Sequence, residues 1–167
     1  SVPALGYILG DEGGGAVMGR MLLSDIFKGV APQHIIEQFY AQYNIDQAEL
    51  LQRVYRTEGA NRYLASFTKF LSARLDDNYI YALVERCFEG FVRRNLAQYP
   101  IKDLYAVGSI AYHFKGVLQR VAEREGYNLI KVVQSPIDSL AEYYTGAEKH
   151  AENSEPSAFR KITEESS

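Results

Sequence analysis

Two acidic residues, Asp11 and Glu12, lie in a glycine-rich segment between Gly10 and Gly13. A strand-like apolar run precedes this segment, and apolar residues at helical spacing follow it. A glycine-rich turn from strand to helix is typical of a phosphate site, but these two acids would repel phosphate. A carboxylate accepts hydrogen bonds from hydroxyl groups, so Asp11 favours a polyol such as a sugar, or a metal-bound water, as its ligand.

The same segment also has a purely structural interpretation. A carboxylate near the start of a helix interacts favourably with the helix dipole. Glu12 therefore fits a capped helix with a flexible entry as well as it fits a ligand-binding turn.

A second candidate site lies in AVGSIAYHF, residues 106–114. Here a strand-like run ends in Gly108-Ser109 and a helical pattern begins directly. Ligands of open α/β sheets bind beyond the carboxyl ends of the strands, and N–H groups at a helix start bind adenine, ribose or phosphate. An ordinary strand-to-helix turn has the same composition and is the alternative.

The elements that must position these residues follow from hydrophobic periodicity. We expect strands at 6–9, 104–107 and 128–135. Because the strands are separated by helical segments, parallel pairing with right-handed crossovers is predicted. The apolar residues of the first helix that fall at helical spacing are Ala16, Val17, Met21, Leu22 and Ile26. Helices are predicted within 13–28, 32–44, 46–57, 60–75, 76–99, 111–125 and 136–144. Asp46 is the predicted N-cap of the third helix, and Gly126 is the expected stop of the helix over 111–125. The predicted apolar stripe of the helix over 76–99 is Ile80, Leu83, Val84, Cys87, Phe88, Phe91 and Val92.

Composition excludes several classes of function. The chain has 167 residues, 47% of them hydrophobic, as in an ordinary globular domain. A net charge of −3 gives no reason to expect nucleic acid or an anionic membrane as a partner. The single cysteine, Cys87, excludes an internal disulfide and a cysteine-based zinc cluster, and favours a cytoplasmic setting. His34, His113 and His150 lack metal-ligand spacing, so no metal site is predicted.

Five segments together resemble the C-terminal part of the BadF/BadG/BcrA/BcrD-type ATPase family, over roughly residues 2–144. The nearest branch contains the N-acetylglucosamine kinase-like proteins. The segments are GYILGDEGGGAVMGR, ANRYLASF, FVRRNL, AVGSIAYHF and SPIDSLAEYY. Near the end, Ser139 stands where the family has glycine, and Tyr143-Tyr144 where it has histidine.

The resemblance implies an α/β fold, the C-terminal lobe of a ribonuclease H-like, actin/hexokinase-type ATPase. Such a lobe is helix-rich with a small, partly parallel sheet. We expect this lobe over 1–145, with a helical insert at about 33–99, and a polar, flexible tail over 146–167. The family's N-terminal lobe, with its phosphate loops and catalytic Asp, has no counterpart in the sequence, and the chain starts without Met. We therefore expect a fragment that is inactive alone.

The resemblance also assigns residues. Asp11 matches the family's sugar-contacting carboxylate, and Gly10, Glu12 and Gly13 shape its loop. Gly108 and Ser109 match the adenosine motif. ATP and Mg²⁺ are the implied cofactors, and no catalytic residue is expected in this chain.

The expected function is part of an ATP-dependent sugar kinase that phosphorylates N-acetylglucosamine or a similar amino sugar. This chain would supply one wall of the nucleotide and sugar sites, and its partner would be the N-terminal lobe. Two alternatives stay open. One is a non-catalytic nucleotide-binding or dimerisation module, whose homodimer would form through the tyrosine-rich helices. The other is a BadF-type ATPase activator fragment, which the lone Cys87 disfavours because an iron–sulfur cluster needs several cysteine ligands.

Overall fold

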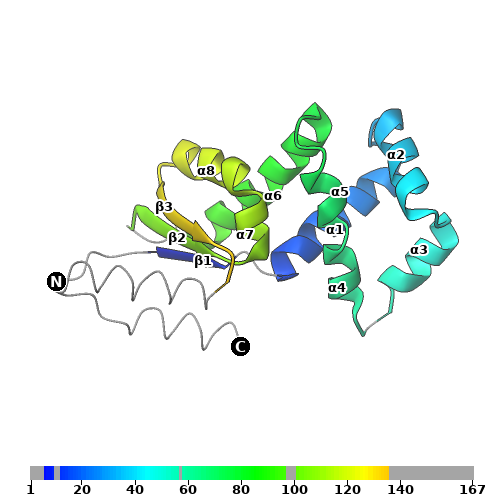
Figure 1. Cartoon of the computed structure of the whole chain (residues 1–167), viewed down its shortest axis with the longest axis horizontal. Helices are drawn as coiled ribbons and strands as arrows, with labels where there is room; N and C mark the ends of the chain where they lie inside the picture. The colour runs from blue at the N-terminus through cyan, green and yellow to red at the C-terminus, as the bar shows by residue number, and fades with distance from the viewer. Residues whose placement is uncertain (1–5, 10–11, 57, 97–100, 136–167) are drawn as a thin grey trace. The chain divides into compact units, whose positions relative to one another are not determined.

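The computed structural model describes residues 6–9, 12–56, 58–96 and 101–135 (Figure 1). The chain forms two compact units: residues 1–11 with 95–167, and residues 12–94. Within the described residues, the first contains the strands and two helices, and the second contains helices and no strand. The prediction of a helix-rich α/β chain with a small parallel sheet is therefore confirmed. The actin/hexokinase-type lobe, its insert and its tail stay predictions.

In the part of the chain that the structure describes, three parallel strands form the sheet, in the order β1-β2-β3. They are β1 (Gly6–Leu9), β2 (Asp103–Val107) and β3 (Asn128–Val133), and they lie side by side in Figure 1. Leu9 pairs with Val107, and Val107 pairs with Val133. The three strands therefore end at the same level, on one edge of the sheet.

Two helices follow β2, where the sequence predicted a single helix over 111–125. They are α7 (Ser109–His113) and α8 (Lys115–Arg124). The prediction is wrong at Phe114, whose dihedral angles (φ −113°, ψ 25°) leave the helical region while its ring is buried. The expected stop at Gly126 is confirmed, because φ is +90° there and Tyr127 N–H donates to Ala122 C=O at 2.8 Å, as in a Schellman motif.

Six helices make up the described part of the second unit. They are α1 (Glu12–Phe27), α2 (Gln33–Tyr43), α3 (Gln47–Val54), α4 (Ala60–Ala65), α5 (Thr68–Ser72) and α6 (Asn78–Leu96). The expected N-cap of α3 is confirmed, because the Asp46 carboxylate accepts a hydrogen bond from Glu49 N–H at 2.8 Å.

The single helix predicted over 60–75 is wrong, because the chain turns between α4 and α5. Two side-chain hydroxyls cause the break. Ser66 Oγ donates to the carbonyl of Tyr63, and Thr68 Oγ1 donates to the carbonyl of Ala65 at 2.7 Å. Both therefore compete with the backbone N–H groups that would continue the helix.

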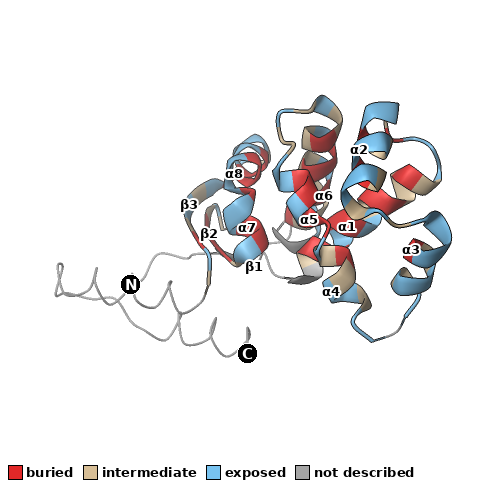
Figure 2. Ribbon diagram, turned by 45° about the vertical axis from the view of Figure 1, so that its right-hand side comes forward, coloured by how far each residue is buried: buried red, intermediate tan, exposed pale blue. Residues whose placement is uncertain are grey.

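Aromatic rings form the centre of the helical unit. The Phe39 ring centroid lies 5.4 Å from that of Phe67 and 5.6 Å from that of Phe70. Tyr43 packs edge-on against Phe67 at 4.9 Å. Figure 2 shows buried residues along the inward sides of these helices. Tilted and edge-on pairs of this kind add stability beyond the area they bury.

The hydrophobic pattern predicted most of the core but misplaced one position of α1. Val17 was expected on the apolar face, yet it is 45% exposed, whereas Met18 is fully buried. The predicted stripe of α6 is buried at Ile80, Leu83, Val84, Cys87, Phe88 and Val92, and half-buried at Phe91.

Helices α1 and α4 meet backbone to backbone at Gly19. A Cβ at this position would lie 2.7 Å from the carbonyl carbon of Leu64 and closer still to its oxygen. Leu64 itself is fully buried. Glycine is therefore required at residue 19 by the close approach of the two helices.

We predict that Gly19→Ala destabilises the helical unit by about 1–3 kcal/mol, because overpacking a core forces backbone shifts. Denaturant unfolding followed by circular dichroism measures this loss. The matched control is Gly14→Ala in the same helix, where a Cβ meets nothing within 4 Å. The control should leave stability unchanged or raise it by up to about 1 kcal/mol, since alanine is the better helix former. Equal effects of the two substitutions would contradict this account of Gly19.

Candidate functional site

The predicted sugar-binding segment lies largely outside the described residues. This applies to Gly10 and Asp11. Helix α1 begins at Glu12, with Gly13 as its second residue, and the side chains of these two residues are also outside the described part. The roles of all four residues therefore stay predictions.

The Gly108-Ser109 turn has the backbone geometry that the sequence suggested. Gly108 has φ 131° and ψ 159°, a conformation that residues with a side chain rarely adopt. Its N–H donates to the carbonyl of Val133 at 2.9 Å, which fixes the turn to the end of β3. Ser109 is exposed and begins α7. Their role in nucleotide binding is not tested by this geometry and stays a prediction.

The register of the sheet gives the two predicted motifs a common edge. Leu9, Val107 and Val133 are paired across the sheet at the carboxyl ends of their strands. In the sequence, the segment GDEG begins directly after Leu9, and Gly108-Ser109 directly after Val107. Ligands of parallel α/β sheets bind at this edge.

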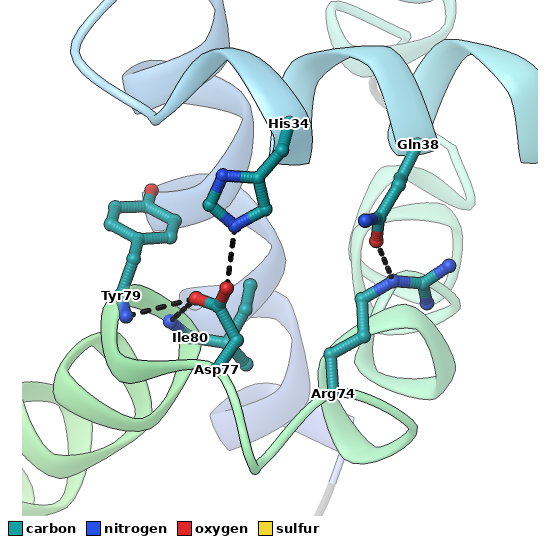
Figure 3. Close-up of polar contacts among 6 residues, drawn as sticks. All are labelled: His34, Gln38, Arg74, Asp77, Tyr79 and Ile80. Carbon is teal, nitrogen blue, oxygen red and sulfur yellow. Dashed lines mark hydrogen bonds and ion pairs between the residues drawn. The ribbon is translucent and has the colours of Figure 1, made fainter.

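The helical unit contains a polar cluster that sequence reasoning missed (Figure 3). His34 Nε2 on α2 lies 2.6 Å from Asp77 Oδ2. The other oxygen of Asp77 accepts hydrogen bonds from the N–H groups of Tyr79 and Ile80 at 2.9 and 3.1 Å. Asp77 is therefore the N-cap of α6 and also its link to α2. The sequence does contain a signal for this N-cap, because Asp77 is an acidic residue directly before a long helical pattern.

Arg74 forms the second half of this cluster. Its Nε donates to Gln38 Oε1 at 2.7 Å, and its Nη2 donates to Gln42 Oε1 at 3.2 Å. Its guanidinium also lies over the Phe70 ring, 3.8 Å from the centroid. A surface hollow of about 510 Å³ beside these groups is lined by Ile35, Gln38, Ala73, Arg74, Asp76 and Asp77. Because Arg74 and Asp77 are already engaged within the unit, the cluster joins helices and leaves little free hydrogen-bonding capacity for a ligand.

A third polar contact connects the end of α1 to α6. Tyr79 Oη donates to Asp25 Oδ2 at 2.6 Å, and Arg86 lies 3.7 Å from the same oxygen. Burial raises the pKa of Tyr79, and the neighbouring Asp25 carboxylate raises it further, so the phenol stays protonated as the donor.

The described residues contain no group of three or more His, Cys, Asp or Glu side chains that could hold a metal ion. His34 is hydrogen-bonded to Asp77, and His113 is exposed on α7. Within the same residues, no helix has both the length and the apolar character needed to cross a bilayer.

Comparison with solved structures finds proteins similar to this chain. No protein-family model matches the chain, and no curated protein does. The chain is similar to a crystal structure from Porphyromonas gingivalis described as a "Putative N-acetylglucosamine Kinase", with 35% sequence identity and a TM-score of 0.73. The match covers 80% of this chain and 48% of that protein, so this chain spans about half its length. The likeness supports the kinase-like part of the predicted resemblance, whereas membership of the BadF-type family stays a prediction.

We predict that Asp77 makes stability depend on acid pH. Partial burial alone would raise the pKa of Asp77, but hydrogen bonds from His34 and from two backbone N–H groups outweigh it, and this pKa lies below its ordinary value. A lowered pKa contributes stability above the unfolded value of about 4, and this contribution is lost as pH falls through the folded value. We measure the free energy of unfolding from pH 6 downward. In Asp77→Asn it should therefore fall less steeply toward acid pH than in the wild type.

The matched control is Asp76→Asn, since Asp76 is exposed and next in sequence. Its free energy of unfolding should depend on pH as steeply as that of the wild type. An unchanged slope in Asp77→Asn would show that this carboxylate does not carry the acid dependence.

We also predict that Cys87 is unreactive in the folded protein. Its side chain is buried, and burial raises the pKa of the thiol to about 11, with Arg94 opposing the shift. The nucleophilic thiolate is therefore scarce at pH 8. Labelling with a disulfide reagent at pH 8 should be slow in the native state and fast in denaturant. Rapid native labelling would mean that α6 does not bury this residue.

Proposed function

We propose that this chain carries nucleotide- and sugar-binding residues of an ATP-dependent kinase acting on N-acetylglucosamine or a related amino sugar. The observation that carries this proposal is the common edge of the sheet, where Leu9 and Val107 end side by side and are followed in the sequence by GDEG and Gly-Ser. The 35% identity to the kinase-like protein from Porphyromonas gingivalis supports it. The proposed fold is the C-terminal lobe of an actin/hexokinase-type ATPase of BadF type.

In this proposal Asp11 binds a sugar hydroxyl, because a carboxylate is a strong hydrogen-bond acceptor. Gly10, Glu12 and Gly13 shape its loop. At the neighbouring strand end, Gly108 lets a nucleotide approach the backbone, because it has no Cβ and holds a conformation that other residues avoid. Ser109 offers its N–H and hydroxyl to the same ligand.

ATP and Mg²⁺ are the proposed cofactors. The described residues contain no metal-ligand cluster, so we propose that Mg²⁺ would be held mainly through the phosphates. Phosphoryl transfer depends on positioning and on stabilising charge at the γ-phosphate. We propose that the catalytic Asp belongs to an N-terminal lobe, which is the partner of this chain, and we assign no catalytic residue within it.

We predict that Asp11→Asn weakens sugar use by about 10- to 100-fold, the effect of losing a hydrogen bond to a charged group. The assay is ADP release with Mg-ATP and N-acetylglucosamine, using this chain alone and this chain joined to an N-terminal lobe from the same genome. Sugar-dependent release is expected in the joined protein, with the loss in Asp11→Asn seen mainly in kcat/KM for sugar. Asp46→Asn, which changes a carboxylate at the start of α3, is the matched control and should keep activity.

A negative result of the ADP-release assay would also decide the question. If the joined protein folds but releases no ADP in response to sugar, the kinase proposal is wrong. Nucleotide binding without turnover would then favour the non-catalytic binding module.

A further inference from the structure

The most exposed large apolar side chain among the described residues is that of Tyr55, which is 81% exposed. Tyr55 is the C-cap of α3, and its backbone N–H donates to the carbonyl of Leu51 at 3.0 Å. The ring therefore projects into solvent from a fixed backbone position. Figure 2 shows α3 exposed along most of its length, and Leu50 is its buried residue. An exposed tyrosine beside arginines is typical of a protein interface, where both residue types are enriched.

A surface hollow of about 360 Å³ lies next to Tyr55, between the end of α3 and the start of α4. Its lining includes Arg56 and Glu58, which are both exposed, and the half-buried Tyr63. Gln52, one helical turn before Tyr55, also lines the hollow. Tyr55 itself does not line the hollow, so its ring leaves the hollow open. We call Tyr55, Arg56, Glu58 and Tyr63 the Tyr55 patch.

The hollow has the chemistry that binds a tyrosine side chain. The Arg56 guanidinium can lie over an aromatic ring, as that of Arg53 lies 5.6 Å from the Tyr63 centroid. The Glu58 carboxylate can accept a hydrogen bond from a phenol, as a carboxylate of α1 accepts one from Tyr79 at 2.6 Å. Both interactions therefore already occur within the helical unit, and the hollow offers them to an incoming ring.

A two-fold axis would bring such a ring and such a hollow together twice. In an isologous interface both copies use the same patch, so Tyr55 of each copy can enter the hollow of the other. The charges of the patch suit this arrangement, because Arg56 of one copy can face Glu58 of the second copy.

We propose that this chain forms a two-fold homodimer through the Tyr55 patch. The ring of Tyr55 in each copy inserts into the hollow between α3 and α4 of the other copy. The proposal concerns a surface of the helical unit and is independent of the kinase proposal.

Sedimentation equilibrium of the 167-residue chain over a range of concentrations tests this proposal. The wild type should show a reversible equilibrium between monomer and dimer. Tyr55→Ala should weaken the dimer by about 30-fold or more, the effect of removing an interface hot spot. Val30→Ala is the matched control and should dimerise as the wild type does, since Val30 is 65% exposed in the turn between α1 and α2. Circular dichroism checks folding, and Tyr55→Glu replaces the alanine variant if that variant fails to fold.

A charge exchange tests whether the two patches face each other. Arg56→Glu alone would set like charges against each other across the axis, and should weaken the dimer by about tenfold or more. The double variant, Arg56→Glu with Glu58→Arg, restores opposite charges between the copies and should recover most of the wild-type affinity. Local disturbance of the fold would not be repaired by the second substitution.

Four results would overturn the proposal. A wild-type chain that stays monomeric at every concentration would show that the surface does not self-associate. A folded Tyr55→Ala variant that dimerises as the wild type does would place the interface elsewhere. Assemblies that grow beyond a dimer would show a head-to-tail contact. A double variant that dimerises no better than Arg56→Glu alone would contradict the two-fold pairing. The kinase proposal is tested separately, by ADP release.

Discussion

Helices α1 and α4 can meet as they do because residue 19 has no side chain. The rest of the helical unit depends on this contact. It fixes Leu64, and the tight turn after α4 then directs Phe67 and Phe70 toward Phe39 on α2. Once α2 is held by these rings, its polar side reaches the turn before α6, where His34 and Gln38 pair with Asp77 and Arg74. The polar cluster is therefore a consequence of packing that begins at a glycine.

The sheet unit depends on a different constraint, the register of its parallel strands. Parallel strands joined by helices all point the same way, so their carboxyl ends gather at one edge. Here Leu9, Val107 and Val133 end level, and the Gly108 N–H is bonded to Val133. A ligand at this edge would meet a turn whose backbone is already fixed. Fixed donors lose little conformational freedom on binding, which favours affinity.

Sequence patterns predicted those features that depend on local physics. The strands, their parallel pairing, the Asp46 cap and the Gly126 stop each follow from a few neighbouring residues. The errors arose where local side-chain hydrogen bonds interrupt a helix and where tertiary contacts decide the structure. Ser66, Thr68 and Phe114 interrupt helices that propensity would continue, and burial selected Met18 over Val17. His34 and Asp77 are 43 residues apart, so no local pattern in the sequence predicts their pairing. The Gly108 turn was predicted because glycine itself is the signal, whereas Gly19 resembles any helical glycine until the neighbouring backbone is known.

Three of the five segments that carry the family resemblance contain residues whose identity the fold constrains. GYILGDEGGGAVMGR contains Gly19, ANRYLASF contains Leu64, and AVGSIAYHF contains Gly108. A Cβ at Gly19 would overlap the Leu64 carbonyl, and the φ of 131° at Gly108 disfavours any residue with a side chain, so few residues can replace these two glycines. A segment under this constraint keeps its pattern for structural reasons alone. The resemblance at these segments therefore bears on the fold, and evidence for chemistry must come from residues whose side chains the packing does not require, such as the exposed Ser109.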